Sequence, residues 1–278
     1  MALIWENKMS LLQIIILSVV QGLTEFLPVS SSGHLILVSK FTNFPDQGLD
    51  MDVAVHIGSI IAVALYFSKD IWRILVDLFK TKFIPNMQTY GSRLFWLVVI
   101  GTIPAVFVGL ALHAHGTEVL RNTKIIGWNI LAFGIILWIA DHYAASARKI
   151  DNMDWKDALI IGMAQCFALI PGTSRSGITI TTSRLLGIER REAAKFCMLL
   201  SVPTIAGAGL LFLYDIIKHG GDVSLFVASQ GIFFSFLASL FAIGVMMQWL
   251  KTRTFLPFVI YRIGLGIFLL LYSYGYIQ

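Results

Sequence analysis

Six long apolar runs are the feature that most constrains the fold of this chain. They cover residues 53–68, 94–112, 125–140, 196–214, 223–250 and 254–277 and are uncharged or nearly so. Because about 20 apolar residues span a bilayer as a helix, we expect each run to be a transmembrane helix. Only 13% of the 278 residues are charged and 57% are hydrophobic, which excludes a soluble globular protein. The sequence predicts an all-α, polytopic membrane protein.

Two further apolar stretches are interrupted by polar and helix-breaking residues. Residues 10–41 contain Pro28, three consecutive serines and Gly33, and residues 157–186 contain PGTSRSG at 171–177. Each half is only about 10–18 residues long, which is short for a full crossing. Non-helical backbone at membrane depth is tolerated only inside protein or beside water. We expect each stretch to be a re-entrant hairpin of two half-helices; a pair of ordinary spans joined by a surface turn is the alternative.

Loop charge predicts how the segments are oriented. Four loops hold 14 of the 21 lysines and arginines, and we expect these loops to be cytoplasmic. These residues are Lys69, Arg73, Lys80, Lys82, Arg93, Arg148, Lys149, Lys156, Arg184, Arg190, Arg191, Lys195, Lys251 and Arg253. Segments 42–52, 113–123 and 215–222 contain only Arg121 and Lys218, so they should face outward.

This alternation of inner and outer loops holds along the whole chain only if each hairpin returns to the side from which it entered. The first hairpin then returns to the outer side and the second to the inner side. We therefore expect one integral membrane domain, residues 1–278, made of two inverted halves, residues 1–141 and 142–278. Each half is a hairpin plus three spans, which gives six full spans and four half-helices. Both termini should be outside. Interrupted segments in corresponding positions of inverted halves indicate a binding site near the membrane midplane.

Several other features of the sequence narrow the choice of class. Cys166 and Cys197 lie in apolar segments, so we expect no disulfide framework. The start, MALIWENK, lacks a basic n-region, and we expect no removable signal peptide. The net charge of +5 fits basic loops. No basic cluster with interleaved aromatic residues occurs, so we expect no nucleic-acid partner.

The first hairpin carries an unusual polar set. Gln21 and Glu25 are four residues apart and share one helix face. Pro28 disfavours helix at the preceding residue and should end the first half-helix. A serine of the triplet then caps the second half-helix and places His34 in its first turn.

The second hairpin offers matching chemistry, because Ser174 or Ser176 can cap its second half-helix beside Arg175. Two half-helix N-termini that meet near the bundle centre form an anion site, and the planar guanidinium suits phosphate oxygens. Glu25 would assist an anion through a divalent cation such as Mg²⁺, which binds through carboxylates plus substrate phosphates. This set suggests phosphoryl or diphosphate chemistry. Further hydrogen-bond donors are Ser30, Ser31, Ser174 and Thr179.

Two motifs carry a family resemblance. GLTEFLPVSSSGH at 22–34 and PGTSRSG at 171–177 resemble the two signature motifs of the bacterial undecaprenyl-diphosphate phosphatases, also known as bacitracin-resistance phosphatases. The similarity extends to FLPFVIYR at 255–262. It implies hydrolysis of the C55 prenyl diphosphate to the monophosphate, which recycles the lipid carrier for peptidoglycan. It also implies a divalent cation, Mg²⁺ or Ca²⁺, and an active site on the outer side of the bacterial cytoplasmic membrane.

The resemblance also assigns roles to residues. The catalytic set it implies is Glu25, Ser31, His34 and Arg175. The substrate-binding residues it implies are Ser30, Ser174, Ser176 and Thr179. The metal ligands are Glu25 and Gln21, and many relatives have Glu where this chain has Gln21, which offers a carbonyl oxygen but no charge. Whether Ser31 or a water molecule attacks phosphorus stays open.

Two alternatives come from other classes. Inverted repeats with broken helices are also typical of transporters, which could move a lipid phosphate or an anion with Glu25 as a proton-coupling carboxylate; a protein that both hydrolyses and flips its lipid is also open. An intramembrane serine protease would leave Glu25 and Arg175 unused, and the chain contains no Gly-x-Ser-Gly. The partners we expect are the long-chain prenyl diphosphate and membrane lipids, and a homodimer is left open.

Overall fold

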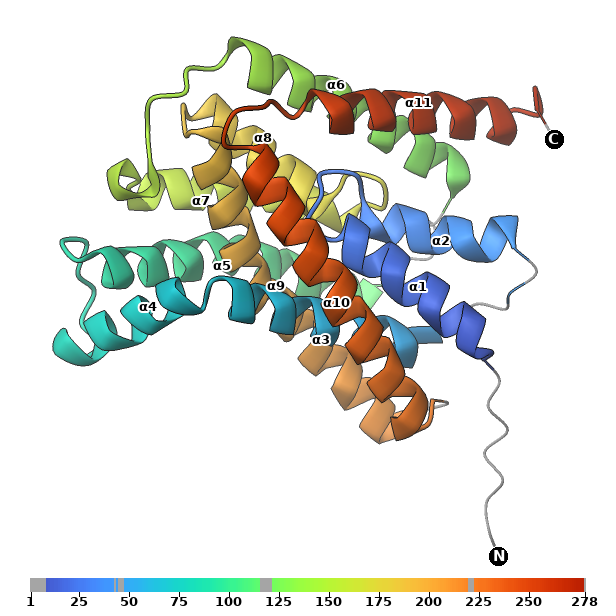
Figure 1. Ribbon diagram of the computed structural model, residues 1–278, viewed down its shortest axis with the longest axis horizontal. Helices are drawn as coiled ribbons and strands as arrows, with labels where there is room; N and C mark the ends of the chain where they lie inside the picture. The colour runs from blue at the N-terminus through green and yellow to red at the C-terminus, as the bar shows by residue number, and fades with distance from the viewer. Residues whose placement is uncertain (1–8, 43, 45–47, 116–121, 220–222, 278) are drawn as a thin grey trace, which may run out of the picture.

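The computed structural model describes residues 9–42, 44, 48–115, 122–219 and 223–277 as a bundle of helices (Figure 1). The helices are α1 (Leu11–Thr24), α2 (Ser31–Phe41), α3 (Gly48–Tyr66), α4 (Ser68–Lys80), α5 (Tyr90–His115), α6 (Thr123–Tyr143), α7 (Trp155–Gln165), α8 (Arg175–Leu185), α9 (Arg190–His219), α10 (Leu225–Trp249) and α11 (Leu256–Ser273), with 3-10 turns η2 (Ile150–Asn152) and η3 (Cys166–Leu169). Within these ranges the only β-type pairing is an isolated bridge between Arg148 and Ile188.

The expected all-α, polytopic class is confirmed. Five helices, namely α5, α6, α9, α10 and α11, are each long and apolar enough to cross a membrane. The α3–α4 pair qualifies as a sixth span only when its two bent parts are taken together. The two interrupted stretches each form a pair of short helices, α1–α2 and α7–α8. The first pair is followed by the bent α3–α4 pair, α5 and α6, and the second by α9, α10 and α11.

The first helix of each hairpin packs against a long helix from the other half of the chain. Gly22 of α1 lies so close to α10 that a Cβ there would be 2.7 Å from the Ser235 carbonyl oxygen. Gly162 of α7 approaches α5 in the same way, because a Cβ there would be 2.4 Å from the Gly101 carbonyl oxygen. Small residues permit such close helix contacts in membranes. At one edge of the bundle, the third long helix of each half, α6 and α11, lie side by side (Figure 1).

Helix α4 corrects the prediction of a loop through Lys69, Arg73 and Lys80. It bends by 75° from α3 instead of continuing it. Leu78 is buried and Ile71 packs against the main core, while other large apolar side chains of α4 are exposed. Apolar residues recur every three or four positions from 71 to 78, which favours an amphipathic helix. The segment was predicted to be a loop from its basic residues, and this periodicity was not considered.

The basic segments predicted to share one side do lie together. The backbone N–H of Arg148 donates to the Gly187 carbonyl at 3.0 Å, and Lys195 pairs with Asp70 at 2.7 Å. Two further contacts link the segment around Arg93 and the segment after α10: Arg93 donates to the Asp151 carbonyl, and the Phe255 N–H donates to Asp141. Of the residues expected on the opposite side, Arg121 and both chain termini, Met1 and Gln278, lie outside the described residues.

Candidate active site

The turns of the two hairpins meet near the middle of the molecule (Figure 1). We call residues 25–31 the first tip and residues 170–176 the second tip. The Ser176 hydroxyl donates to the Leu27 carbonyl at 2.8 Å, and Arg175 Nη2 donates to Glu25 Oε1 at 2.7 Å. The tips are therefore joined by a hydrogen bond from a side chain to a backbone carbonyl and by an ion pair. The two residues of the ion pair are 150 positions apart in the sequence.

The two tips are built by the same local device. Ser30 and Ser174 are the N-caps of α2 and α8, and their hydroxyls accept from the backbone N–H of Gly33 and Gly177, respectively. Both serines have positive φ, 77° and 71°. Non-glycine residues rarely adopt this conformation, which costs of order 1–3 kcal/mol and is found mainly at functional sites. The repeated Ser-x-Ser-Gly pattern thus places Ser31 and Arg175 at equivalent first positions of two half-helices.

The carboxylate of Glu25 is the centre of a polar cluster. Its Oε2 accepts from the Ser31 hydroxyl at 2.5 Å and from Gln21 Nε2 at 2.8 Å. His56 Nε2, from α3, lies 3.6 Å from the same oxygen. We call Glu25, these three residues and Arg175 the Glu25 cluster. Glu25 is only 6% exposed, and a buried intramembrane carboxylate held in this way indicates function.

Two atoms of this cluster are buried without a hydrogen-bond partner among the described residues. They are Arg175 Nη1, a donor, and Gln21 Oε1, an acceptor. Buried polar groups are normally paired, so orphaned ones point to something that binds there. A donor of this kind suits a phosphate oxygen, and a carbonyl oxygen beside a carboxylate suits a hard divalent cation. No group of three His, Cys, Asp or Glu side chains that could hold a metal occurs in the described ranges.

His34 lies in the first turn of α2, as expected, but outside the Glu25 cluster. Its Nδ1 contacts the Ser30 carbonyl at 2.7 Å, so this nitrogen carries the proton. Its Nε2 then accepts from the Tyr261 hydroxyl at 2.6 Å, and the two rings stack. Any proton that reaches Nε2 must therefore pass the tyrosine or displace it. Sequence reasoning singled out the stretch that contains Tyr261 but gave this residue no role.

The four residues assigned to substrate binding are close to the tips, but their hydroxyls make internal bonds. Ser30 and Ser174 cap helices, and Ser176 joins the tips as described above. Thr179 donates to the Arg175 carbonyl at 2.8 Å and contacts Cys197 Sγ at 3.0 Å. In this structure these four side chains shape the tips, and direct contact with substrate remains a prediction for them.

Arg262, on α11, fixes both tips from one side. It is fully buried, as few arginines are, and within the described residues its hydrogen bonds go to backbone carbonyls. The acceptors are Pro28 of the first tip, Gly172 and Thr173 of the second tip, and Asn129 and Ile130 of α6. Arg262 thus ties α11 to α6 and to both tips.

Comparisons with known proteins give one consistent result. The family model described as bacitracin resistance protein BacA matches residues 14–268. A protein named undecaprenyl-diphosphatase from Roseobacter denitrificans is 45% identical, over 96% of this chain and 100% of its own length. Proteins of the same name from Erythrobacter litoralis and Alteromonas mediterranea are 41% and 42% identical, over 94% and 96% of this chain and 99% and 100% of their own lengths. The chain belongs to the bacitracin resistance protein BacA family.

Proposed function

We propose that this protein hydrolyses undecaprenyl diphosphate to undecaprenyl phosphate and inorganic phosphate. This reaction recycles the lipid carrier of cell-wall synthesis and confers bacitracin resistance. The relatives named undecaprenyl-diphosphatase match it over nearly their whole length. The observation that carries the proposal is the position of Arg175 against Glu25, with Nη1 buried and unpaired at the joint of the two tips. Hydrolysis is favoured over transport of a lipid phosphate or an anion.

Arg175 is proposed to grip the diphosphate. Its unpaired Nη1 donates to a phosphate oxygen, and its position at the start of α8 adds the backbone N–H groups of that helix end. Positive charge fixed in a site from which water is excluded stabilises the charge that develops as the phosphorus–oxygen bond breaks. The Arg175–Glu25 ion pair holds the guanidinium in place before substrate arrives.

A divalent cation, Mg²⁺ or Ca²⁺, is proposed to be held by Glu25 and by Gln21 Oε1. The oxygen ligands and the orphaned carbonyl fit such an ion, which would neutralise charge on the phosphate oxygens when bound. Since Gln21 brings no charge, Glu25 is the only carboxylate in the Glu25 cluster. Phosphate oxygens of the substrate and water would complete the coordination of such an ion.

Ser31 is placed for either of two roles. As nucleophile, its Oγ attacks the terminal phosphorus, its proton passes to Glu25 along the 2.5 Å hydrogen bond, and the bond to the bridging oxygen breaks. Water then cleaves the phosphoserine. In the other route, water attacks directly and Ser31 remains a donor that orients Glu25 or a phosphate oxygen. His34, through Tyr261, is proposed to carry a proton to or from the site.

The orientation of the protein is also a proposal. We place it in the bacterial cytoplasmic membrane with the basic loops inside, in line with the excess of Lys and Arg in cytoplasmic loops. The site then opens to the outer side and both termini lie outside. The equivalent packing of α1 on α10 and of α7 on α5 supports two inverted halves, 1–141 and 142–278. A homodimer remains a prediction.

Phosphate release from C55 prenyl diphosphate by purified protein in detergent tests this function, because transport has no meaning without two compartments. We expect release that a chelator abolishes and that Arg175→Ala lowers about 10²–10³-fold, with Lys156→Ala, an exposed basic residue, as the matched control. Trapping a phosphoenzyme that is lost in Ser31→Ala supports serine attack, whereas wild-type turnover in Ser31→Ala eliminates it. Absence of phosphate release from the folded wild-type protein contradicts the proposal.

A further inference from the structure

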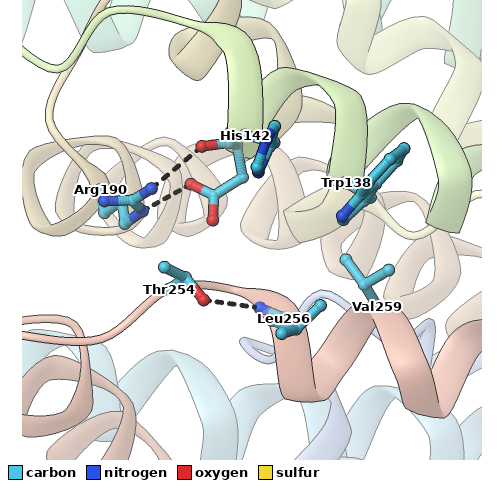
Figure 2. Close-up of a pocket in the computed structure, with 7 residues that line it drawn as sticks. Trp138, His142, Arg190, Thr254, Leu256 and Val259 are labelled. Atoms are coloured by element: carbon cyan, nitrogen blue, oxygen red, sulfur yellow. Dashed lines mark hydrogen bonds and ion pairs between the residues drawn. The ribbon is translucent and has the colours of Figure 1, made fainter.

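A cavity lies away from the two tips, where the end of α6 meets the starts of α9 and α11 (Figure 2). Its volume is about 190 Å³. Trp138, Asp141 and His142 line it from α6, Arg190 from the first residue of α9, and Thr254 from the segment before α11. None of these residues belongs to the Glu25 cluster, and the proposed reaction uses none of them.

The charged side chains at the cavity are two arginines and one aspartate, of which Arg190 and Asp141 line it and Arg184 lies buried behind Asp141. Asp141 is its only acidic lining residue, and its carboxylate is already neutralised: Oδ1 accepts from Arg184 at 3.1 Å and from Arg190 at 2.7 Å. The second oxygen, Oδ2, accepts from the Phe255 N–H at 3.0 Å. Two arginines therefore face one carboxylate, and Arg190 Nη2 also donates to the Asp141 carbonyl at 3.0 Å. Arg184 is fully buried, whereas the Arg190 side chain is 28% exposed and borders the cavity (Figure 2).

Further donors stand beside Arg190. His142 is exposed and stacks on Trp138 with ring centroids 5.7 Å apart. No hydrogen bond links its ring nitrogens to another residue in the described ranges. The Thr254 hydroxyl lies at the same rim, where it accepts from the Leu256 N–H at 3.3 Å, and its own proton is available to a ligand. A guanidinium, an imidazole and a hydroxyl around one small cavity are donors for a phosphate group.

The other wall of the cavity is apolar and opens along the outside of the bundle. Trp138 and Leu256 are 39% and 46% exposed, and Ile139 and Ile260 beside them are also exposed. On helices that cross a membrane, such side chains face lipid, and tryptophan favours the headgroup level. The cavity is smaller than the roughly 300–1,000 Å³ of sites that enclose a whole small molecule. It is therefore suited to a charged headgroup whose apolar part lies outside.

We propose that this cavity binds the phosphate headgroup of an anionic phospholipid, with the acyl chains along the lipid-facing sides of α6 and α11. The second arginine beside Asp141, the donors of His142 and Thr254, and the exposed apolar wall each match one part of such a molecule. Basic pockets between helices near the cytoplasmic surface are known to take anionic headgroups. Because Arg190 starts α9 and Thr254 precedes α11, an occupied site ties three helix ends together and stabilises the folded protein.

Native mass spectrometry and thermal unfolding of the purified full-length protein in detergent test this. The probes are phosphatidylglycerol, zwitterionic phosphatidylcholine with the same acyl chains, and inorganic phosphate. We expect phosphatidylglycerol to bind and to raise the melting temperature more than the other two. Arg190→Gln and His142→Gln should each weaken its binding about tenfold, the size of one charge-assisted hydrogen bond. Lys156→Gln, an exposed basic residue of the same end, is the matched control and should bind normally.

The variants keep the test decisive in either direction. His142→Gln removes no internal hydrogen bond of the described chain, so it serves even where Arg190→Gln does not fold. Phosphate release that stays at the wild-type rate shows that a variant is folded. Equal binding by wild type and His142→Gln, equal binding of the two phospholipids, or equal stabilisation by inorganic phosphate each overturns the proposal. A loss in Lys156→Gln as large as in His142→Gln also overturns it, because surface charge alone then explains the binding.

Discussion

Replacing Arg262 by methionine removes a side chain of α11 that bonds to both hairpin tips. Three of its acceptors are tip carbonyls, those of Pro28, Gly172 and Thr173, at 3.2, 3.1 and 3.0 Å. Methionine has a similar length and fills the space without donating hydrogen bonds. The tips then keep the Ser176–Leu27 hydrogen bond and the Arg175–Glu25 ion pair, but lose their common anchor on α11.

The expected loss of folding stability is the difference between a cost and a gain. Each buried carbonyl left without a donor costs about 1–3 kcal/mol, which for the three tip carbonyls amounts to roughly 3–9 kcal/mol. Methionine does not require the burial of a charge, and this offsets several kcal/mol. We expect a net destabilisation of about 3 kcal/mol, within the range for breaking buried charged contacts. Since a 1 Å displacement of catalytic groups costs about 10²-fold in rate, kcat/KM should fall by about that factor.

Thermal unfolding measures the destabilisation and phosphate release measures the fall in kcat/KM, both on the same purified protein. Arg184→Met is the matched control, because Arg184 is equally buried but lies nine residues along α8 from Arg175, about 13 Å away. It should lower stability and leave turnover per folded molecule near the wild-type value. Wild-type kcat/KM in Arg262→Met would refute the argument that this residue positions the tips.

Three further predictions concern single contacts. Tyr261→Phe removes the hydroxyl that donates to His34 at 2.6 Å; we expect a shifted pH–rate profile with the melting temperature little changed, and an identical profile would exclude proton transfer by this route. Ser174→Ala removes the N-cap of α8 and should cost about 1 kcal/mol in unfolding experiments, whereas Ser174→Gly, which tolerates the positive φ, should cost less; the reverse order would contradict the capping argument. Gln21→Glu adds a second carboxylate beside Glu25, so half-maximal activity should need less Mg²⁺ or Ca²⁺; an unchanged requirement would place the cation elsewhere.

Much of the fold was predictable because hydrophobicity and chain breaks are local signals. The six apolar runs gave the long helices to within a few residues, and the breaks after Glu25 and before Ser174 located both tips. Helix α4 was wrongly predicted as a loop because its basic residues are typical of a cytoplasmic loop. The helical spacing of Ile71, Ile74 and Leu78 was not considered. The two short motifs contain Glu25, Ser31 and Arg175 of the Glu25 cluster, but they did not point to His56, and their His34 lies outside the cluster.

Contacts between residues far apart in the sequence could not be predicted from local sequence patterns. Tyr261 is 227 positions from His34, and nothing in either motif predicts that they stack. Side-chain direction was equally hidden. Thr179 was expected to offer a donor to substrate, but its position one turn after Arg175 directs its hydroxyl to the Arg175 carbonyl and to Cys197. The caps at Ser30 and Ser174 were foreseen in kind, but their positive φ could only come from coordinates.

The most direct test of a single site shared by both tips is the affinity for a prenyl diphosphonate whose bridging oxygen is replaced by methylene, which cannot be hydrolysed. We expect Arg175→Ala, on the second tip, to weaken binding by about tenfold or more, the loss of one hydrogen bond from a charged group. Ser31→Ala, on the first tip, should weaken binding of the same ligand. Wild-type affinity in either variant would mean that only one tip holds the diphosphate, and the two-sided site proposed for this protein would be wrong.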